Sequence, residues 1–133
     1  MRLTLRQWLN KLKPAGFAGL VAVAIMSAIV MAESGGVTNA RNPETGTYPP
    51  TTRFPQGTYD RGAAQINSGW WPQFTDAQCD DPTETAKACW IISQGGTRWI
   101  DWHTYTNGAY VKFLPLRYRV LKHLRPELFG STR

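Results

Sequence analysis

The chain has 133 residues, which is enough for one domain with a single hydrophobic core and too short for two ordinary domains. Hydrophobic residues make up 42% of it, aromatic residues 12% and charged residues 18%. This excludes a disordered chain, because disorder goes with few aromatic residues and much charge. The net charge of +6 favours a polyanionic partner, and charge alone leaves nucleic acid, an anionic membrane and an acidic cell wall open.

The start of the chain combines a basic segment, residues 1–14, with a charge-free apolar stretch, residues 15–32. Three interpretations fit this order. A signal peptide fits the basic start, the apolar middle and the small-x-small ending Val30-Met31-Ala32. A membrane anchor fits less well, because 18 residues lie near the lower limit for spanning a bilayer. The third interpretation is a buried core helix, and composition alone leaves it level with a signal peptide.

Residues 35–60 are rich in glycine and proline, which interrupt any helical or strand period. We expect loop and short strands here, including a small antiparallel hairpin that forms one wall of a cleft. Residues 60–71 follow with small residues and two tryptophans beside polar amides, a composition that predicts a compact turn or a short helix.

Two longer helices are predicted in the second half of the chain. Asp81 is a suitable N-cap and Pro82 a suitable first residue for a helix that runs through Ile92 until Gly95-Gly96 ends it. Residues 114–124 predict a basic, partly amphipathic helix that ends before Pro126. Between these helices, a short helix or turn holds three aromatic residues, Trp99, Trp102 and Tyr105.

The two cysteines, Cys79 and Cys89, do not have the spacing of a metal site, and we expect them to form one disulfide outside a reducing cytosol. The two histidines, His103 and His123, have no partner at a zinc-site spacing. We expect both on the surface and assign them no role. The sequence predicts no metal and no organic cofactor.

Glu33 and Asp60 are the candidate pair for acid–base chemistry. Hydrolysis of a glycosidic bond needs a carboxylic acid that stays protonated near neutral pH and, usually, an ionised carboxylate across the sugar. Glu33 follows the apolar stretch, where burial would raise its pKa, whereas Asp60 lies near polar residues, Thr58 and Arg61, that would keep it ionised. Signal cleavage after Ala32 would leave Glu33 as a solvated N-terminus, so the catalytic and targeting interpretations conflict.

The run from residue 58 to residue 71 reads TYDRGAAQINSGWW. It resembles the strand-and-turn signature of animal-type (c-type) lysozymes, including the acid, the Gly-x-x-Gln-Ile-Asn-Ser core and the tandem tryptophan. Upstream, Ala32-Glu33-Ser34 is similar to the Glu-Ser pair that ends the catalytic helix of c-type lysozymes and soluble lytic transglycosylases. Downstream, residues 91–102 resemble the segment that places a tryptophan against the catalytic glutamate.

The chain is also similar to the lysozyme-like domains of bacteriophage tail and lysis proteins. These domains carry Ala-Gly-Phe, a long Ala/Val/Ile helix, Glu-Ser-Gly-Gly and Asn-Gly-Ala-Tyr, which this sequence has at residues 15–17, 20–32, 33–36 and 107–110. In those domains the apolar stretch is the helix that carries the acid. The resemblance therefore favours the core helix over the signal peptide.

The fold implied by the resemblance is α+β and mainly α, with a small loop and β-hairpin lobe beside a helical lobe and a cleft between them. The resemblance covers roughly residues 15–110. We expect a basic N-terminal segment at 1–14, a lysozyme-like catalytic domain at 15–125 and a C-terminal tail at 126–133.

The resemblance also implies roles for single residues. Glu33 is implied as general acid and then base, and Asp60 as nucleophile or as stabiliser of an oxocarbenium-like transition state. Trp99 is implied to desolvate Glu33, while Trp102 is expected in the core. The implied substrate-binding residues, which hydrogen-bond or stack on sugars, are Ser34, Gln65, Asn67, Trp70, Trp71, Trp99 and Tyr105.

Several departures from c-type lysozymes keep alternatives open. The loop between Glu33 and Asp60 is longer and proline-rich, Ala63-Ala64 replaces a larger apolar pair, and the four disulfides are absent. If Asp60 does not face Glu33, the site becomes that of a single-glutamate lytic transglycosylase that forms 1,6-anhydro products. A domain that binds glycan without cutting it, or a structural part of a phage tail, is the non-enzymatic alternative.

The expected function is that of a peptidoglycan muramidase, which cleaves the β-1,4 bond between N-acetylmuramic acid and N-acetylglucosamine. We favour a hydrolase over a transglycosylase because Asp60 is present. The expected partner is bacterial peptidoglycan and not nucleic acid, with membrane contact only if residues 15–32 are a targeting sequence. We expect a monomer that acts on the cell wall from outside the cell or from a virion.

Overall fold

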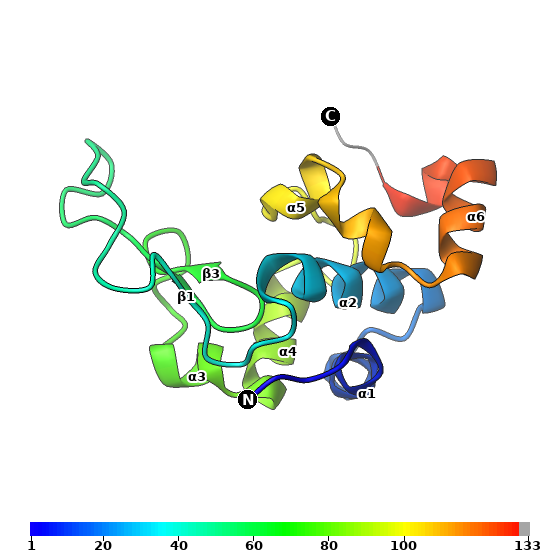
Figure 1. Cartoon of the computed structure of the whole chain (residues 1–133), viewed down its shortest axis with the longest axis horizontal. Helices are drawn as coiled ribbons and strands as arrows, with labels where there is room; N and C mark the ends of the chain where they lie inside the picture. The colour runs from blue at the N-terminus through cyan, green and yellow to red at the C-terminus, as the bar shows by residue number, and fades with distance from the viewer. Residues whose placement is uncertain (131–133) are drawn as a thin grey trace.

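The computed structural model describes residues 1–130 as a mainly helical α+β fold, which confirms the predicted fold class (Figure 1). In chain order, the elements are α1 (Leu5–Ala15), α2 (Leu20–Ser34), β1 (Arg41–Asn42), β2 (Asp60–Arg61), β3 (Ile66–Asn67), α3 (Asp76–Asp80), α4 (Pro82–Ile92), α5 (His103–Thr106), the 3-10 helix η1 (Ala109–Phe113), α6 (Leu116–Leu124) and the 3-10 helix η2 (Pro126–Phe129).

The centre of the helical half is α2, which is apolar on every side. Every residue from Val23 to Val30 is buried, as expected for a helix surrounded by other elements. Figure 1 shows α1 below α2 and α5 above it. The apolar stretch thus forms the buried core helix that the resemblance favoured, and it ends at Gly35 in the left-handed conformation with φ 66°. Among residues 1–130, no helix is both long and apolar enough to cross a membrane.

Helix α1 lies in the segment that the sequence set apart as a basic N-terminal piece. It begins with a capping box, in which the Thr4 side chain accepts from the Gln7 backbone N–H and the Gln7 side chain accepts from the Thr4 backbone N–H. Trp8 and Leu12 on its inner face are fully buried. This segment therefore contributes to the same core as the catalytic domain predicted for residues 15–125.

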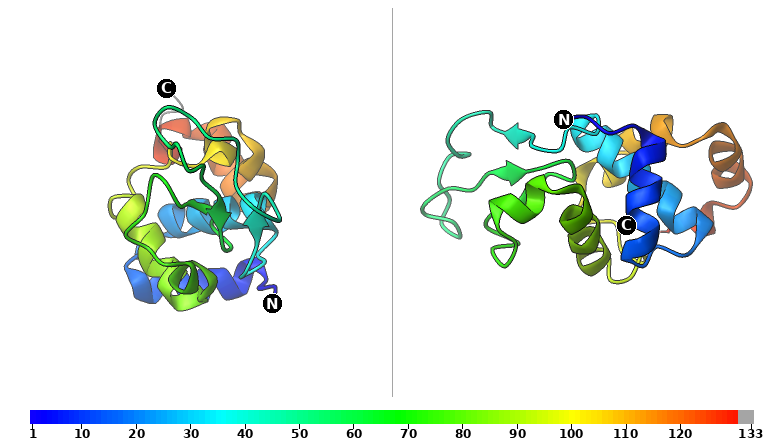
Figure 2. Two further views of the ribbon diagram at one scale, coloured as in Figure 1. Left: turned by 90° about the vertical axis from the view of Figure 1, so that its left-hand side faces the viewer. Right: turned by 90° about the horizontal axis from the view of Figure 1, so that it is seen from below.

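The strand half is a small antiparallel sheet in the order β1-β2-β3. Asp60 on the central strand is paired with Asn42 on one side and Asn67 on the other. The long loop between β1 and β2, residues 43–57, reaches away from the helices (Figures 1 and 2). The hairpin expected within residues 35–60 is thus a three-stranded sheet that also takes in residues 66–67.

Gly62 allows the sheet to pack closely against α3. Its φ of +74° is in the left-handed region, and an added Cβ would lie 1.8 Å from the carbonyl oxygen of Cys79. The two cysteines, Cys79 in α3 and Cys89 in α4, are buried free thiols. The expectation of a disulfide was therefore wrong, because both side chains pack as small apolar groups where α3 contacts α4.

The later helices follow the predicted start and stop residues. Asp81 caps α4 by accepting from the backbone N–H of Glu84, and Pro82 occupies the first helical position. Helix α6 spans Leu116–Leu124 and is followed by Pro126 in η2. The residues of the C-terminal tail are described up to residue 130.

Candidate active site

A cavity of about 400 Å³ lies where the end of α2 meets the small sheet. It contains both candidate carboxyl groups, which come from different halves of the molecule. The cleft predicted between a helical lobe and a strand lobe is therefore present. Its lining residues are Glu33, Asp60, Gln65, Ile66, Asn67, Trp70, Trp71, Ile92, Asp101, Trp102 and His103.

Glu33 lies in the last turn of α2, at the end of the buried apolar helix. Its Oε1 accepts a hydrogen bond of 3.3 Å from the Thr104 hydroxyl. Burial raises the pKa of Glu33 to about 7, the Thr104 hydrogen bond opposes this rise, and the charge of Asp60 adds to it. A carboxyl group with this pKa is still partly protonated at neutral pH, as a proton donor to a glycosidic oxygen must be.

Asp60 is held by two donors on the sheet side of the cavity. Its Oδ2 accepts from the Tyr48 hydroxyl at 2.6 Å, and its Oδ1 accepts from the Asn67 side-chain amide at 3.0 Å. The Asn67 amide also donates to the Thr58 hydroxyl at 3.1 Å. Burial and the neighbouring Asp60 raise the pKa of Tyr48, so the phenol keeps the proton that it donates. These contacts orient the Asp60 carboxylate.

The neighbouring Arg61 does not share the environment of Asp60. Successive side chains of a strand point to opposite faces, and Arg61 is buried on the face away from the cavity. Its guanidinium donates to the carbonyl oxygens of Ile66, Phe74 and Trp71 at 3.1, 2.6 and 3.0 Å. The expectation that Arg61 is one of the polar residues around Asp60 was wrong, and Arg61 instead fixes the turn that carries the cavity tryptophans.

An aromatic wall flanks the carboxylates on the sheet side. The Trp70 side chain is 56% exposed, and Trp71 is partly buried. The Phe54 ring from the 43–57 loop packs edge-to-face on Trp70 at 5.2 Å between centroids, and the Arg53 guanidinium lies 4.3 Å from the Trp70 centroid. A largely exposed indole held on one side offers its surface to the apolar face of a sugar ring.

Four of the seven predicted substrate-binding residues line the cavity: Gln65, Asn67, Trp70 and Trp71. Gln65 has a φ of 52°, and its side-chain amide donates to the Gly62 carbonyl at 2.8 Å. The Asn67 side chain also accepts from the backbone N–H groups of Gly69 and Trp70. These bonds hold the turn 62–70 in shape, so the polar groups are fixed before any ligand binds.

The other three predicted residues lie outside the cavity lining. Ser34 completes the end of α2, where its hydroxyl donates to the Val30 carbonyl and accepts from the Gly36 backbone. Trp99 stacks on Phe17 with centroids 6.3 Å apart and lines a different pocket, together with Tyr105 and Gly130. The prediction that it desolvates Glu33 was therefore wrong.

Tyr105 also belongs to the core and not to the cleft. Its hydroxyl donates to the Phe129 carbonyl at 2.5 Å, and its ring stacks on Tyr110 at 5.1 Å. Trp102, which was expected in the core, is buried there and also lines the cavity with Glu33. Its indole N–H donates to the Ala64 carbonyl at 3.0 Å. Trp102, and not Trp99, thus shares the cavity with Glu33.

The sequence analysis missed several residues that contact the carboxylates or line the cavity. Ile66, Ile92 and Asp101 line it without a predicted role. Tyr48 lies in the proline-rich loop, where no periodicity marks it, and Thr104 lies in a four-residue helix. His103 was assigned to the surface without a role, and it is exposed but also lines the cavity. Within residues 1–130 there is no cluster of three or more His, Cys, Asp and Glu side chains that could hold a metal ion.

A family model described as Lysozyme like domain matches residues 10–104, well over half of the 133-residue chain. The matched range contains every residue that lines the cavity, from Glu33 to His103. A search of curated proteins and a search of solved structures each found no significant match. A lysozyme-like domain suggests cleavage of peptidoglycan glycan strands and implies peptidoglycan as substrate, whereas the match does not bear on a bacteriophage origin. The chain belongs to the family of lysozyme-like domains.

Proposed function

We propose that this protein is a muramidase that hydrolyses the β-1,4 bond between N-acetylmuramic acid and N-acetylglucosamine. The observation that carries the proposal is the pair of unlike carboxyl groups in one cavity. Glu33 is a partly buried acid with a pKa of about 7, while Asp60 is oriented by Tyr48 and Asn67. This is the difference in environment that glycosidic cleavage by two carboxyl groups requires.

In this mechanism Glu33 donates its proton to the glycosidic oxygen as the bond to the anomeric carbon breaks. Asp60 lies on the other side of the cavity and stabilises the developing positive charge or bonds to the anomeric carbon. Glu33, now ionised, then takes a proton from water, and the water oxygen adds to the anomeric carbon. The sugar is held by the polar groups of Gln65 and Asn67 and by the surface of Trp70.

A lytic transglycosylase is the second candidate, and one observation favours it. Each oxygen of the Asp60 carboxylate already accepts from a protein donor, Tyr48 or Asn67, as expected for an aspartate that only supports the sheet. Glu33 would then act alone, and the 6-hydroxyl of the muramyl residue would attack in place of water. The product would carry a 1,6-anhydro end in place of a reducing end.

The substitution Glu33→Gln separates an enzyme from a glycan-binding protein. The amide keeps the size of the side chain but has no acidic proton, so clearing of a cell-wall suspension should fall by about three orders of magnitude or more. Sedimentation with insoluble wall should remain. Glu44→Gln is the matched control, because Glu44 is an exposed carboxylate on the 43–57 loop. Equal clearing by wild type and Glu33→Gln would remove the catalytic assignment.

Mass spectrometry of the released muropeptides separates the two enzymatic candidates. A hydrolase leaves a reducing end, which is heavier by one water than the 1,6-anhydro end of a transglycosylase. We expect reducing ends. We also propose that the protein acts on the cell wall as a monomer, from outside the cell or from a virion. Its net charge of +6 would attract it to anionic wall polymers.

A further inference from the structure

Helix α6 carries an apolar stripe that faces away from the core. Leu116, Val120 and Leu124 are spaced four residues apart, which places them on one side of a helix. Their exposed fractions are 67%, 50% and 68%. The opposite side packs inward through Tyr118, which is buried, and Leu121, which is partly buried. Three large apolar side chains in a row on a free helix face are unusual unless something covers them.

A further exposed apolar residue lies at the start of α2. Leu20, the first residue of α2, is 66% exposed. It lines a narrow groove of about 60 Å³ together with Leu5 and Leu9 of α1. Helix α6 borders this groove through its N-cap Pro115 and through Arg117. The apolar surface is thus a patch at one end of the molecule and not a single helix face.

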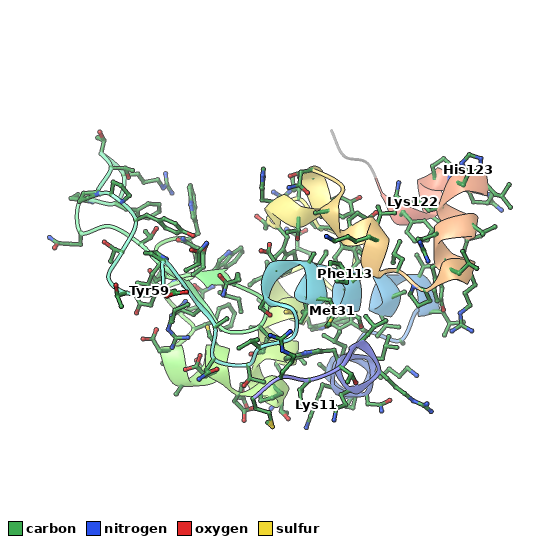
Figure 3. The ribbon with its side chains drawn as sticks, viewed as in Figure 1. Lys11, Met31, Tyr59, Phe113, Lys122 and His123 are labelled. Atoms are coloured by element: carbon green, nitrogen blue, oxygen red, sulfur yellow. The ribbon has the colours of Figure 1, made fainter. Side chains whose placement is uncertain are left out.

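Positive charge surrounds this patch. Between residues 102 and 126 the sequence has no Asp or Glu, and its Lys and Arg residues are Lys112, Arg117, Arg119, Lys122 and Arg125. Arg117 and Arg119 are exposed and flank the stripe along the helix, while Arg125 is paired with Glu127. Lys122 and His123 lie at the same outer end of the molecule (Figure 3).

We propose that the α6 surface, formed by Leu20, Leu116, Val120 and Leu124 with Arg117 and Arg119, binds the surface of an anionic lipid bilayer. An apolar stripe flanked by arginines is the pattern of a helix that lies in the membrane interface, with its side chains below the headgroups and its cations among them. Anionic polysaccharides or nucleic acids would satisfy the arginines but would leave the stripe exposed to water.

The position of α6 fits binding of a bilayer and of glycan at the same time. Helix α6 lies at the opposite end of the molecule from the 43–57 loop, and no α6 residue lines the cavity (Figure 1). A protein attached through α6 would keep its cleft open. The family match ends at residue 104, so helix α6 lies beyond the matched residues, whereas Leu20 lies within them. The proposal does not depend on the reaction assigned to Glu33.

The test is co-sedimentation of the full chain with vesicles of phosphatidylcholine alone or mixed with phosphatidylglycerol. We expect binding to the mixed vesicles that weakens with salt and little binding to phosphatidylcholine alone. In the triple variant Leu116→Ser, Val120→Ser, Leu124→Ser, the affinity should fall on the order of tenfold or more. Ile91→Ser is the matched control, because Ile91 is a 57% exposed apolar residue on α4. This variant should bind the mixed vesicles as tightly as wild type does.

A second variant tests the charges without changing the stripe. Arg117→Gln with Arg119→Gln should weaken binding to the mixed vesicles and reduce its salt dependence. Both variants should keep the melting temperature and the wall-clearing rate of wild type. The proposal is overturned if wild type does not bind the mixed vesicles, or if the triple variant binds them as well as wild type. It is also overturned if the stripe only pairs two copies of the chain, seen as a dimer in sedimentation velocity without vesicle binding.

Discussion

The two halves that meet at the cavity are held together by different interactions. The helical half surrounds α2, whose residues from Val23 to Val30 are all buried and mostly apolar. The strand half has three strands of two residues each, and its shape comes from buried polar contacts around Arg61 and Asn67. The comparison shows how one small domain can give two carboxyl groups different environments.

Each carboxyl group takes its character from the half that carries it. Glu33 ends the apolar helix, so burial is the main cause of its raised pKa. Asp60 is carried by the polar sheet, where Tyr48 and Asn67 hold its two oxygens. If this division is correct, changes in the strand half should affect the orientation of Asp60, and changes around α2 should affect the proton on Glu33.

Among changes in the strand half, the largest effect is expected from Asp60→Asn. The amide keeps the shape of the side chain but removes the negative charge that, in the proposed mechanism, faces the developing positive charge on the sugar. By analogy with removal of one electrostatic group from other active sites, the hydrolysis rate should fall about 100- to 1,000-fold, or roughly 3 to 4 kcal/mol. The measurement is the release of reducing ends from purified cell wall.

Tyr48→Phe is a milder change to the same carboxylate and should have a smaller effect. It leaves the charge of Asp60 but removes the hydrogen bond of 2.6 Å to Oδ2, and a loss of about tenfold is expected from one hydrogen bond to a charged group. If neither variant reduces the rate and the products carry anhydro ends, Asp60 is a structural residue. The reaction is then that of a transglycosylase with Glu33 alone.

The next largest effect concerns stability and compares the two halves directly. Arg61→Ala would remove the side-chain donor from the carbonyl groups of Ile66, Phe74 and Trp71, although the Trp71 carbonyl also accepts from the Phe74 backbone N–H. We expect a loss of about 3 to 5 kcal/mol in the free energy of unfolding. Ile29→Val, which removes one methyl group from the fully buried centre of α2, should cost about 1 kcal/mol. Urea denaturation measures both, and a smaller loss for Arg61→Ala than for Ile29→Val contradicts the comparison.

The same contrast explains which parts of the fold the sequence could predict. The helical half depends on apolar runs and on caps, which are local signals, and so α2, α4 and α6 lie where the sequence placed them. In the strand half, the Gln-Ile-Asn-Ser turn was recognisable by its resemblance. Tyr48 was not, because a tyrosine in a proline-rich loop has no period and its contact with Asp60 depends on the path of the whole loop.

The choice between Trp99 and Trp102 failed for a similar reason. The two indoles are three residues apart, and the chain between Ile92 and His103 turns so that one packs on Phe17 and the other lines the cavity. Which of them reaches the cavity depends on the direction in which this segment leaves α4. That direction is set by packing against the core and not by the local sequence.

A smaller effect is expected when the free energy of unfolding of Glu33→Gln is compared with that of wild type at different pH values. The pKa of Glu33 rises from an ordinary value of 4.5 to about 7 in the folded protein. The folded state therefore favours the protonated form, and this contribution is complete below about pH 4.5 and is lost as pH rises through 7. Glutamine, which cannot ionise, should avoid that loss.

The expected result is that Glu33→Gln matches wild type near pH 4.5 and exceeds its free energy of unfolding at pH 8 on the order of 2 kcal/mol, a value lowered for the partial exposure of the carboxyl group. Denaturation curves at the two pH values measure the difference. A pH-independent difference between the two proteins would mean that the helical half does not hold the carboxyl group in a dry environment.

The smallest expected effect is on the pKa of Glu33, which residues of both halves influence. Thr104 of the helical half donates to Glu33 and lowers its pKa, whereas the charge of Asp60 in the strand half raises it. Thr104→Val should therefore move the Glu33 titration, followed by carboxyl-carbon NMR, upward by a fraction of a pH unit, and Asp60→Asn should move it downward. Thr106→Val on the same short helix is the control, because the Thr106 hydroxyl donates to the His103 carbonyl and not to Glu33. A hydrogen bond to the charged form and a nearby negative charge have opposite effects on the pKa of Glu33. Shifts of the titration in the same direction would therefore contradict the view that the two halves act on Glu33 separately.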